Sequence, residues 1–382
     1  MSRAGKENTQ FLKIKKEYAE EFLKLIKTKF SDEQIIDKRK KVIHSGPHVL
    51  FPLIKNSKKL SNFIDSEVFD LKFEIINAGG ELDPKYKFRS LEDALVDELP
   101  ANILESIPKS FDVIGKIAII EFDRFNNLNI DKSSFYKKEV AKAIVKVNKG
   151  VEVVYEKKSE VKGKYRLKEL QLIFGEDNSE TIHKENNCTF KLDVKKTYFT
   201  PRLVFERKRL SLLKFAKNEF IVDMFAGVGP ISIQIAKSNR VKIYSFDVNP
   251  TAYKFLIENV KLNKLEGEIL PYNIDVVDLT NSSNELGFNL KSRVDRIIMN
   301  LPEQSINYID ISCFLMKKTG GILHFYQFCE KPNPIEKGIE KLRIKLNKIG
   351  WYLEEIINSK IVKPFSPKSD LIVIDAKIKS IS

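Results

Sequence analysis

The pattern of hydrophobic and polar positions changes near residue 200. From residue 201 onwards, short apolar strands alternate with amphipathic helices, beginning with FIVDMFA (220–226) and GPISIQIAKSN (229–239). This alternation predicts a mostly parallel, doubly wound α/β sheet. Two β-rich stretches, 352–365 and 370–378, follow without a helix between them. We expect them to form a hairpin, which leaves one antiparallel strand at the edge of a seven-stranded sheet.

Before residue 200 the pattern predicts two smaller α+β groups. In the first, the later part of 11–29 has helical period, 41–53 and 68–80 are strand-like, and the pair Gly79-Gly80 indicates a linker. The second group has a helical stretch that Pro100 must interrupt. Its further elements are a strand pair at 111–122, a helix at 136–148, and strands at 151–157, 165–175 and 188–199. The domains predicted from these patterns are 1–80, 81–196 and 197–382.

Composition excludes several classes of protein. Of the 382 residues, 42% are hydrophobic and 31% are charged, which is typical of a folded globular chain. The first residues, MSRAGKENTQ, are too polar for a signal peptide, and no apolar run is long enough to span a membrane. Three cysteines without a CxxC pair argue for a reducing compartment and against a structural zinc site. We therefore expect a cytoplasmic protein with no membrane partner.

The formal net charge of +14 is concentrated in blocks. Residues 1–60 carry 15 basic and 7 acidic side chains, and residues 131–170 carry 12 basic and 6 acidic ones. Clustered positive charge favours a nucleic acid partner, because phosphate neutralisation drives such binding. A lysine-rich solvated surface would account for the charge equally well.

A glycine-rich loop follows the first strand of the α/β domain. Asp223 precedes Gly227 and Gly229 in it, and Asp247 ends the next strand. Such glycines let the backbone approach a ligand, and a carboxylate at the next strand end can accept from ribose hydroxyls. The loop differs from the dinucleotide fingerprint GxGxxG because Ser232 takes the place of the last glycine. With Asp223, this difference favours S-adenosylmethionine over NAD, which stays the alternative.

Two further strand ends carry polar side chains. Asp275 ends the third strand, where its carboxylate can accept from an adenine amine, and Asn300-Leu301-Pro302 ends the fourth. The carboxyl ends of such strands line the ligand crevice. Asn300 offers donors and an acceptor, and Pro302 makes the loop rigid. The alternatives are an ordinary loop aspartate at 275 and a helix-capping asparagine at 300.

The chain resembles the archaeal and eukaryotic tRNA (guanine-37 N1)-methyltransferase family. The segments that carry the resemblance are TYFTPRLVFERKRL (197–210), IVDMFAGVGPISI (221–233), FDVNPTA (246–252), IIMNLP (297–302), KSEVKGKYRLKEL (158–170), IHKEN (182–186) and, more loosely, FLKIKKEYAEEFLKLI (11–26). The resemblance implies a class I, Rossmann-like methyltransferase domain preceded by two smaller α+β domains. It also implies S-adenosylmethionine as methyl donor and a tRNA with guanosine at position 37 as substrate. No metal is implied.

The resemblance assigns roles to single residues. Glu206 matches the general base that takes the proton from guanine N1, and Arg166 matches the arginine that supports guanine O6. Asn300 and Pro302 match the loop that holds the target base. Positions that match cofactor contacts are Tyr198, Arg207, Asp223, Phe225, Gly227, Asp247, Val248, Asp275, Val276 and Asn300. The positions expected to bind RNA are Lys162, Lys164, Arg166, Lys168 and Arg202.

Other interpretations stay open. Without the resemblance, Glu206 would be taken for half of a surface ion pair at i,i+3 or i,i+4 spacing, and Arg166 for a solvated loop residue. The four histidines are not spaced as a set of metal ligands. A related wyosine-pathway tRNA transferase, which moves an aminocarboxypropyl group or also methylates the tricyclic base, is the nearest alternative. A noncatalytic RNA-binding protein with a methyltransferase-like fold is the other. We expect a monomer.

Overall fold

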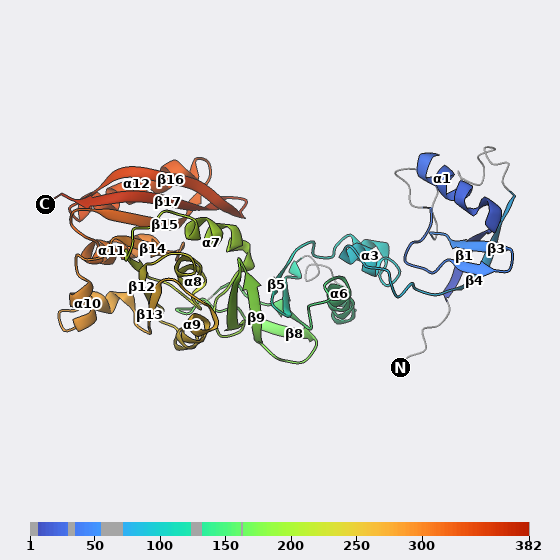
Figure 1. The fold of residues 1–382 in the computed structure, drawn as a ribbon, viewed down its shortest axis with the longest axis horizontal. Coiled ribbons are helices and arrows are strands. Elements are labelled where there is room, and N and C mark those ends of the chain that lie inside the picture. Colours follow the sequence, from blue (N-terminus) through green and yellow to red (C-terminus); the bar gives the residue numbers. More distant parts are fainter. Residues whose placement is uncertain (1–6, 30–34, 55–71, 124–131, 162, 382) are drawn as a thin grey trace. The chain divides into compact units, whose positions relative to one another are not determined.

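The computed structural model divides into two compact units, residues 1–89 and 90–382 (Figure 1). The residues it describes are 7–29, 35–54, 72–123, 132–161 and 163–381. The predicted division into three domains at 80/81 and 196/197 stays a prediction. No helix in the described part of the chain is both long and apolar enough to cross a membrane.

The described residues of the first unit form a four-stranded antiparallel sheet and the helix α1. The strands lie in the order β2-β3-β1-β4. Its elements are β1 (Glu7–Lys15), η1 (Lys16–Tyr18), α1 (Ala19–Lys29), β2 (Ile43–Ser45), β3 (His48–Pro52) and β4 (Phe73–Gly80). Leu12 and Ile14 of β1 pack with Phe22 of α1 and with Val49 and Phe51 of β3 to form its core. The later part of 11–29 is helical as predicted, whereas its first five residues belong to β1.

The predicted linker at Gly79-Gly80 is wrong, because both glycines lie in β4. Gly80 pairs with Glu7 and Gly79 pairs with Asn8. A Cβ atom on Gly80 would lie 2.3 Å from Oγ1 of Thr9. Glycine is needed here because the two strands approach closely, which a sequence pattern does not distinguish from a flexible turn.

The second unit begins with a small sheet in the order β5-β6-β7-β8. β6 and β7 are parallel and are joined through α6, and the other pairs are antiparallel. The elements are α3 (Leu91–Leu95), α4 (Ala101–Leu104), β5 (Phe111–Ile114), β6 (Ile117–Ile120), α6 (Ser133–Val147), β7 (Val153–Lys157) and β8 (Leu170–Phe174). Pro100 separates α3 from α4, as predicted. The strand predicted at 165–175 is shorter, because residues 163–166 belong to the loop before it.

A hairpin of β9 (Glu180–Glu185) and β10 (Cys188–Asp193) follows. Asn259 of α9 (Pro250–Leu262) holds β10. Its Oδ1 accepts from the Lys191 N–H at 2.7 Å, and its Nδ2 donates to the Lys191 carbonyl at 3.0 Å. The asparagine thus satisfies a backbone pair as a neighbouring strand would. The predicted strand 188–199 therefore ends at Asp193, and its later residues lead into the helix that carries Glu206.

The seven-stranded sheet has the order β13-β12-β11-β14-β15-β17-β16. The strands are β11 (Phe220–Asp223), β12 (Lys242–Phe246), β13 (Glu268–Tyr272), β14 (Arg296–Met299), β15 (Gly321–Glu330), β16 (Trp351–Ser366) and β17 (Ser369–Ser380). β11 to β15 are parallel, and β16 and β17 form the predicted hairpin. The antiparallel strand is β17, which lies between β15 and β16, one place in from the edge. The prediction that the antiparallel strand lies at the edge is wrong, because β16 pairs with the outer side of β17 and itself forms the edge.

Both faces of this sheet are buried. Ile221 packs in the core cluster that contains α8, while its neighbour Val222 packs in the cluster that contains α11 and α12. The helices around the sheet are α7 (Val204–Ser211), α8 (Pro230–Ala236), α9 (Pro250–Leu262), α10 (Glu285–Leu290), α11 (Ile309–Leu315) and α12 (Pro334–Lys348). Burial on two faces is the environment in which parallel strands are stable, so the predicted doubly wound fold is confirmed.

Candidate active site

The predicted cofactor side chains meet at the carboxyl ends of the parallel strands. Asp223 ends β11, Asp247 follows β12, Asp275 lies beyond β13, and Asn300 follows β14. β13, β12, β11 and β14 are neighbours in that order. The four side chains therefore lie along one edge of the sheet, where α/β folds bind their ligands.

Asp247 fixes the glycine loop. Its Oδ2 accepts from the Gly227 N–H at 2.7 Å, and its Oδ1 accepts from the Asn249 N–H at 2.8 Å. Burial raises the pKa of Asp247, against these two backbone hydrogen bonds. Gly227 and Gly229 have φ of +57° and +87°, so the turn uses backbone conformations that other residues adopt only with strain. Val248, the next residue, is half-buried at the same edge.

Replacing Gly229 by alanine is expected to lower the free energy of unfolding by about 2–4 kcal/mol. Beyond the positive φ, the new Cβ would lie 2.3 Å from Cδ1 of Leu256 and 3.1 Å from Cδ1 of Ile233. Gly350→Ala is the matched control, because Gly350 has φ of +75° and a Cβ added there would meet no described atom within 4 Å. Urea unfolding followed by circular dichroism measures both variants, and equal losses would contradict the steric part of the prediction.

Asp223 is the most deeply buried of the predicted cofactor residues. It is 0% exposed, and burial raises its pKa to about 6. Ser232 Oγ donates to its Oδ2 at 2.7 Å, and Ser245 Oγ donates to Ser232 Oγ at 2.8 Å. Ser232, which replaces the third glycine of the dinucleotide fingerprint, thus holds Asp223 in place. The other carboxylate oxygen, Oδ1, is buried and has no hydrogen-bond partner among the described residues.

The loop that carries Arg166 lies against this edge through two ion pairs. Lys164 Nζ is 2.9 Å from Asp275 Oδ2, and Arg166 Nη2 donates to Glu303 Oε1 at 3.0 Å. The hydrogen bond with Asp275 raises the pKa of Lys164. The structure therefore places Lys164, predicted to bind RNA, on a residue predicted to bind the cofactor. Glu303, which sequence reasoning did not assign, holds Arg166.

Arg166 itself is unusual in backbone and in side chain. Its φ is +55°, in the left-handed region. The guanidinium carbon lies 5.1 Å from the centre of the Tyr198 ring, and Nε and Nη1 are buried without a hydrogen bond to a described residue. Burial raises the pKa of Tyr198, and the Tyr198 carbonyl oxygen lies beside Gly227. Tyr198 therefore contacts the Arg166 guanidinium through its ring and approaches Gly227 through its carbonyl oxygen.

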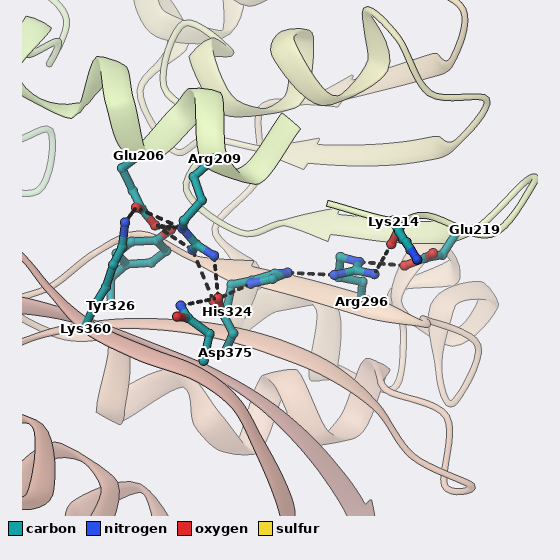
Figure 2. A network of polar contacts seen from close by, with 10 residues as sticks. Glu206, Arg209, Lys214, Glu219, Arg296, His324, Tyr326, Lys360 and Asp375 are labelled. Carbon is teal, nitrogen blue, oxygen red and sulfur yellow. Dashed lines mark hydrogen bonds and ion pairs between the residues drawn. The ribbon is translucent and has the colours of Figure 1, made fainter. Parts of the chain in front are cut away.

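Glu206 lies in a buried polar network (Figure 2). It is 4% exposed, and it accepts from Arg209 Nη2 at 2.6 Å, from Tyr326 Oη at 2.7 Å and from Lys360 Nζ at 2.8 Å. Burial alone would raise the pKa of Glu206, but the hydrogen bonds from Arg209, Lys360 and Tyr326 outweigh it and place the pKa below its ordinary value. The i,i+3 ion pair considered from the sequence exists, but in the interior rather than on the surface.

Arg207, predicted to contact the cofactor, has other partners here. Its Nη2 donates to Glu185 Oε2 at 2.6 Å, and Nη1 donates to the Thr200 carbonyl at 3.2 Å. Its guanidinium lies 5.0 Å from the centre of the Phe199 ring. These contacts join β9 to α7 and thereby fix the helix that carries Glu206. The cofactor contact of Arg207 stays a prediction.

The Asn300 loop is held from behind. Ser305 Oγ donates to the Met299 carbonyl at 2.9 Å, and the Phe328 N–H donates to the Pro302 carbonyl at 3.1 Å. Asn300 is half-buried, and its side chain makes no hydrogen bond to another described residue. The remaining predicted cofactor residues line the same edge. Phe225 packs edge-to-face on Tyr308, with ring centres 5.1 Å apart, and Val276 is buried beside Phe246.

Two other residues predicted to bind RNA lie at a hollow of about 360 Å³. A third, Lys162, lies outside the described residues. Lys168 and Arg202 line this hollow, and Arg202 Nε donates to Asp112 Oδ1 at 2.7 Å. Burial lowers the pKa of Lys168, whose Nζ lies 6.0 Å from the centre of the Tyr198 ring. Among the described residues, no group of three His, Cys, Asp or Glu side chains could hold a metal ion.

A parallel sheet with one reversed strand beside its edge, a glycine loop after β11 and an acid after β12 define a class I, Rossmann-like methyltransferase. The family described as the TRM5/TYW2 methyltransferase domain matches residues 181–353, and the TYW2 N-terminal domain matches residues 91–178. A tRNA (guanine(37)-N(1))-methyltransferase Trm5b of Pyrococcus abyssi is 37% identical over 84% of this chain and 90% of its own length. The chain therefore belongs to the TRM5/TYW2 methyltransferase family, as the sequence predicts.

Two further comparisons show the range of this family. A solved structure of the complex of aTrm5 and tRNALeu has a TM-score of 0.68 and 30% identity, covering 96% of this chain and 99% of its own. A tRNA(Phe) (4-demethylwyosine(37)-C(7)) aminocarboxypropyltransferase of Methanocaldococcus jannaschii is 31% identical over 69% of this chain and 99% of its own length. The likeness to the first extends over nearly the whole chain, and the likeness to the second over about two thirds of it.

Proposed function

We propose that this protein is a tRNA (guanine-37 N1)-methyltransferase that uses S-adenosylmethionine. The observation that carries the proposal is the pair of buried, unpartnered donors on Arg166, held on Tyr198 beside the glycine loop. A buried guanidinium with unpaired donors is costly unless a ligand acceptor takes them. The O6 oxygen of a guanine base is an acceptor of the right kind.

S-adenosylmethionine fits the residues at the strand ends. It supplies a methyl group on a positively charged sulfonium. Asp223 has a buried oxygen without a partner among the described residues, which suits a cationic group on the ligand, and Asp247 and Asp275 are acceptors for ribose hydroxyls and the adenine amine. The absence of a side chain at Gly227 leaves space for the ligand beside the loop. Among the described atoms outside the neighbouring residues, only the Tyr198 carbonyl oxygen lies within 4 Å of a Cβ placed there. A related structure in complex with AdoMet supports this assignment.

Glu206 and Arg166 divide the work on the guanine. Glu206 is held ionised and takes the proton from N1, whose N–H electron pair stays on nitrogen. N1 then forms its new bond to the methyl carbon while the electron pair of the broken S–C bond stays on sulfur. Arg166 stabilises the negative charge that develops on O6. Asn300, which has free donors and an acceptor, holds the base edge, and Pro302 fixes its loop.

The charge of the site is conserved in this step. The positive charge of the sulfonium disappears on transfer, and the proton that arrives on Glu206 replaces it. Since the base must leave its stack to reach these groups, we expect guanosine 37 to be flipped into the site. Lys162, Lys164, Lys168 and Arg202 are proposed to bind the surrounding phosphates, and the basic first module is proposed to grip the tRNA elsewhere. We also propose that the protein acts as a monomer in the cytoplasm.

Incubating the protein with S-adenosylmethionine and a tRNA carrying G37 is expected to give N1-methylguanosine at that position. The same tRNA with A37 is the matched control and is expected to stay unmodified, because adenine has no N1–H to lose and no O6. Mass spectrometry of the digested nucleosides measures both. Methylation of neither tRNA, or equal methylation of both, would contradict the proposal.

The second candidate is the wyosine-pathway transfer of an aminocarboxypropyl group. The match of residues 91–178 to the TYW2 N-terminal domain and the likeness to an aminocarboxypropyltransferase favour it. A buried ionised carboxylate at Glu206 favours N1 methylation instead, because that reaction requires a base to remove the N1 proton. The mass of the modified nucleoside distinguishes the two, since the groups transferred differ in mass.

A further inference from the structure

A chain of polar contacts continues from Glu206 through Arg209 (Figure 2). Arg209 lies between two carboxylates: its Nη2 donates to Glu206 Oε1 at 2.6 Å, and its Nη1 donates to Asp375 Oδ2 at 2.6 Å. These three side chains come from α7 and β17. Both carboxylates are buried, with side chains 5% and 3% exposed. Arg209 is thus shared between two buried anions.

Asp375 is fixed in turn by residues of β15 and β16. His324 Nδ1 lies 2.6 Å from Asp375 Oδ1, and Asn358 donates to Asp375 Oδ2 at 3.0 Å. On its other side, His324 Nε2 lies 3.0 Å from Arg296 Nη1. An arginine can only donate, so Nε2 accepts and Nδ1 carries the hydrogen that is donated to Asp375. Burial lowers the pKa of His324, which agrees with a neutral ring.

The network is neutral when Glu206 is ionised. Arg296 ends the chain of contacts, because its Nε donates to Glu219 Oε1 at 2.6 Å. The charged groups balance three against three: the cations are Arg209, Arg296 and Lys360, and the anions are Glu206, Asp375 and Glu219. Uncompensated charge is costly in a protein interior. Removing one of these charges therefore changes the pKa of Glu206. The pKa rises when a positive charge is lost and falls when a negative charge is lost.

We propose that Arg209 and Asp375 are positioning residues for the methyl transfer, which keep Glu206 ionised and aimed while leaving it basic enough to take the N1 proton. The inference rests on the proposed function, because it takes Glu206 as the base. Arg209 supplies the positive charge that stabilises ionised Glu206. Asp375 binds Nη1 of the same guanidinium and thereby weakens the stabilisation of Glu206 by Arg209. Neither residue touches the substrate in this proposal.

The groups that face Glu206 come from four elements. They are Arg209 on α7, Tyr326 on β15, Lys360 on β16 and, beyond Arg209, Asp375 on β17. Burial raises the pKa of Glu206, and the hydrogen bonds from Arg209, Lys360 and Tyr326 lower it. The negative charge of Asp375, on the far side of Arg209, is a like charge and therefore disfavours ionised Glu206. Loss of Arg209 must therefore raise the pKa of Glu206, and loss of the Asp375 charge must lower it.

The test measures the rate of single-turnover methyl transfer as a function of pH in two variants. One removes a positive charge near Glu206, and the other removes a negative charge. In Arg209→Gln, the acidic limb of the rate profile is expected to move up by about 1–3 pH units, because a nearby opposite charge is worth that shift. In Asp375→Asn, which removes the negative charge and replaces one of the two acceptor oxygens by a donor, the rate is expected to fall roughly tenfold across the profile without an upward shift of that limb. Arg209→Lys keeps the charge and is expected to restore the wild-type limb.

Arg343→Gln is the matched control, because Arg343 forms the same i,i+3 pair with Glu340 on the exposed face of α12. Its profile is expected to be unchanged. An unshifted acidic limb in Arg209→Gln, or a wild-type rate in Asp375→Asn, would overturn the proposal. If Arg209→Gln does not fold, the test uses Asp375→Asn alone and the double variant Arg209→Gln/Asp375→Asn, in which the positive and negative charges of the network balance again. Both variants are studied by the same measurement. Failure of the proposed function looks different, because the wild-type protein itself would then not methylate G37.

Discussion

Glu206→Gln is expected to slow single-turnover methyl transfer by about 10²–10⁴-fold, the contribution of a well-placed general base. Glutamine keeps the size of the side chain and an acceptor for the Tyr326 hydroxyl, but it cannot take a proton from N1. Because the pKa of Glu206 lies below its ordinary value, the wild-type base is ionised throughout the neutral range. The loss in the variant is therefore expected to be the same at every neutral pH.

The affinity for S-adenosylmethionine tests whether this loss is chemical. Calorimetric titration is expected to give an unchanged dissociation constant for Glu206→Gln, because the contacts of Glu206 are with Arg209, Tyr326 and Lys360. Glu340→Gln, which removes the carboxylate of an exposed i,i+3 pair, is the matched control and is expected to keep full activity. Full activity of Glu206→Gln would refute its assignment as the base.

Arg166→Ala is expected to lower the rate of transfer by about 10²–10³-fold, the usual effect of removing one preorganised donor from a developing oxyanion. Two of its nitrogen atoms are buried and have no partner among the described residues, so O6 would supply the acceptor that they lack. Arg166→Lys is expected to recover only part of the rate, since an ammonium group lacks the planar fork of donors.

The backbone of Arg166 requires its own control. Since φ is +55° at this position, any change in activity could arise from the loop conformation rather than from the side chain. Arg166→Gly relieves the backbone strain and removes the guanidinium, so it is expected to be as slow as Arg166→Ala. An active glycine variant would show that the guanidinium is not needed.

Much of the second unit follows from the sequence because its signals are local. Alternating strands and helices predict the doubly wound sheet, and Gly227, Gly229 and Asp247 lie within one βαβ segment. The side of the sheet on which they meet follows from the parallel direction of the strands. The order of β16 and β17 does not follow, because a hairpin can pair with either arm next to β15.

The surroundings of Glu206 could not be predicted from local pattern. Tyr326 and Lys360 come from β15 and β16, and in the sequence each is one of several polar residues in its strand. The sequence pattern assigns no role to Glu303, and the structure shows that it accepts a hydrogen bond from Arg166. The resemblance to a family assigned Glu206 and Arg166, while their partners became visible only in three dimensions.

The partners of Glu206 also bear on the order in which this unit can fold. Arg209 and Asp375 are 166 residues apart in sequence, and Glu206 and Tyr326 are 120 apart. Contacts between such distant residues form late, because a long loop must close before they are made. Until the β16–β17 hairpin docks, Glu206 lacks Lys360 and Arg209 lacks Asp375. The surroundings proposed to make Glu206 a base are therefore complete only once this hairpin is paired with β15.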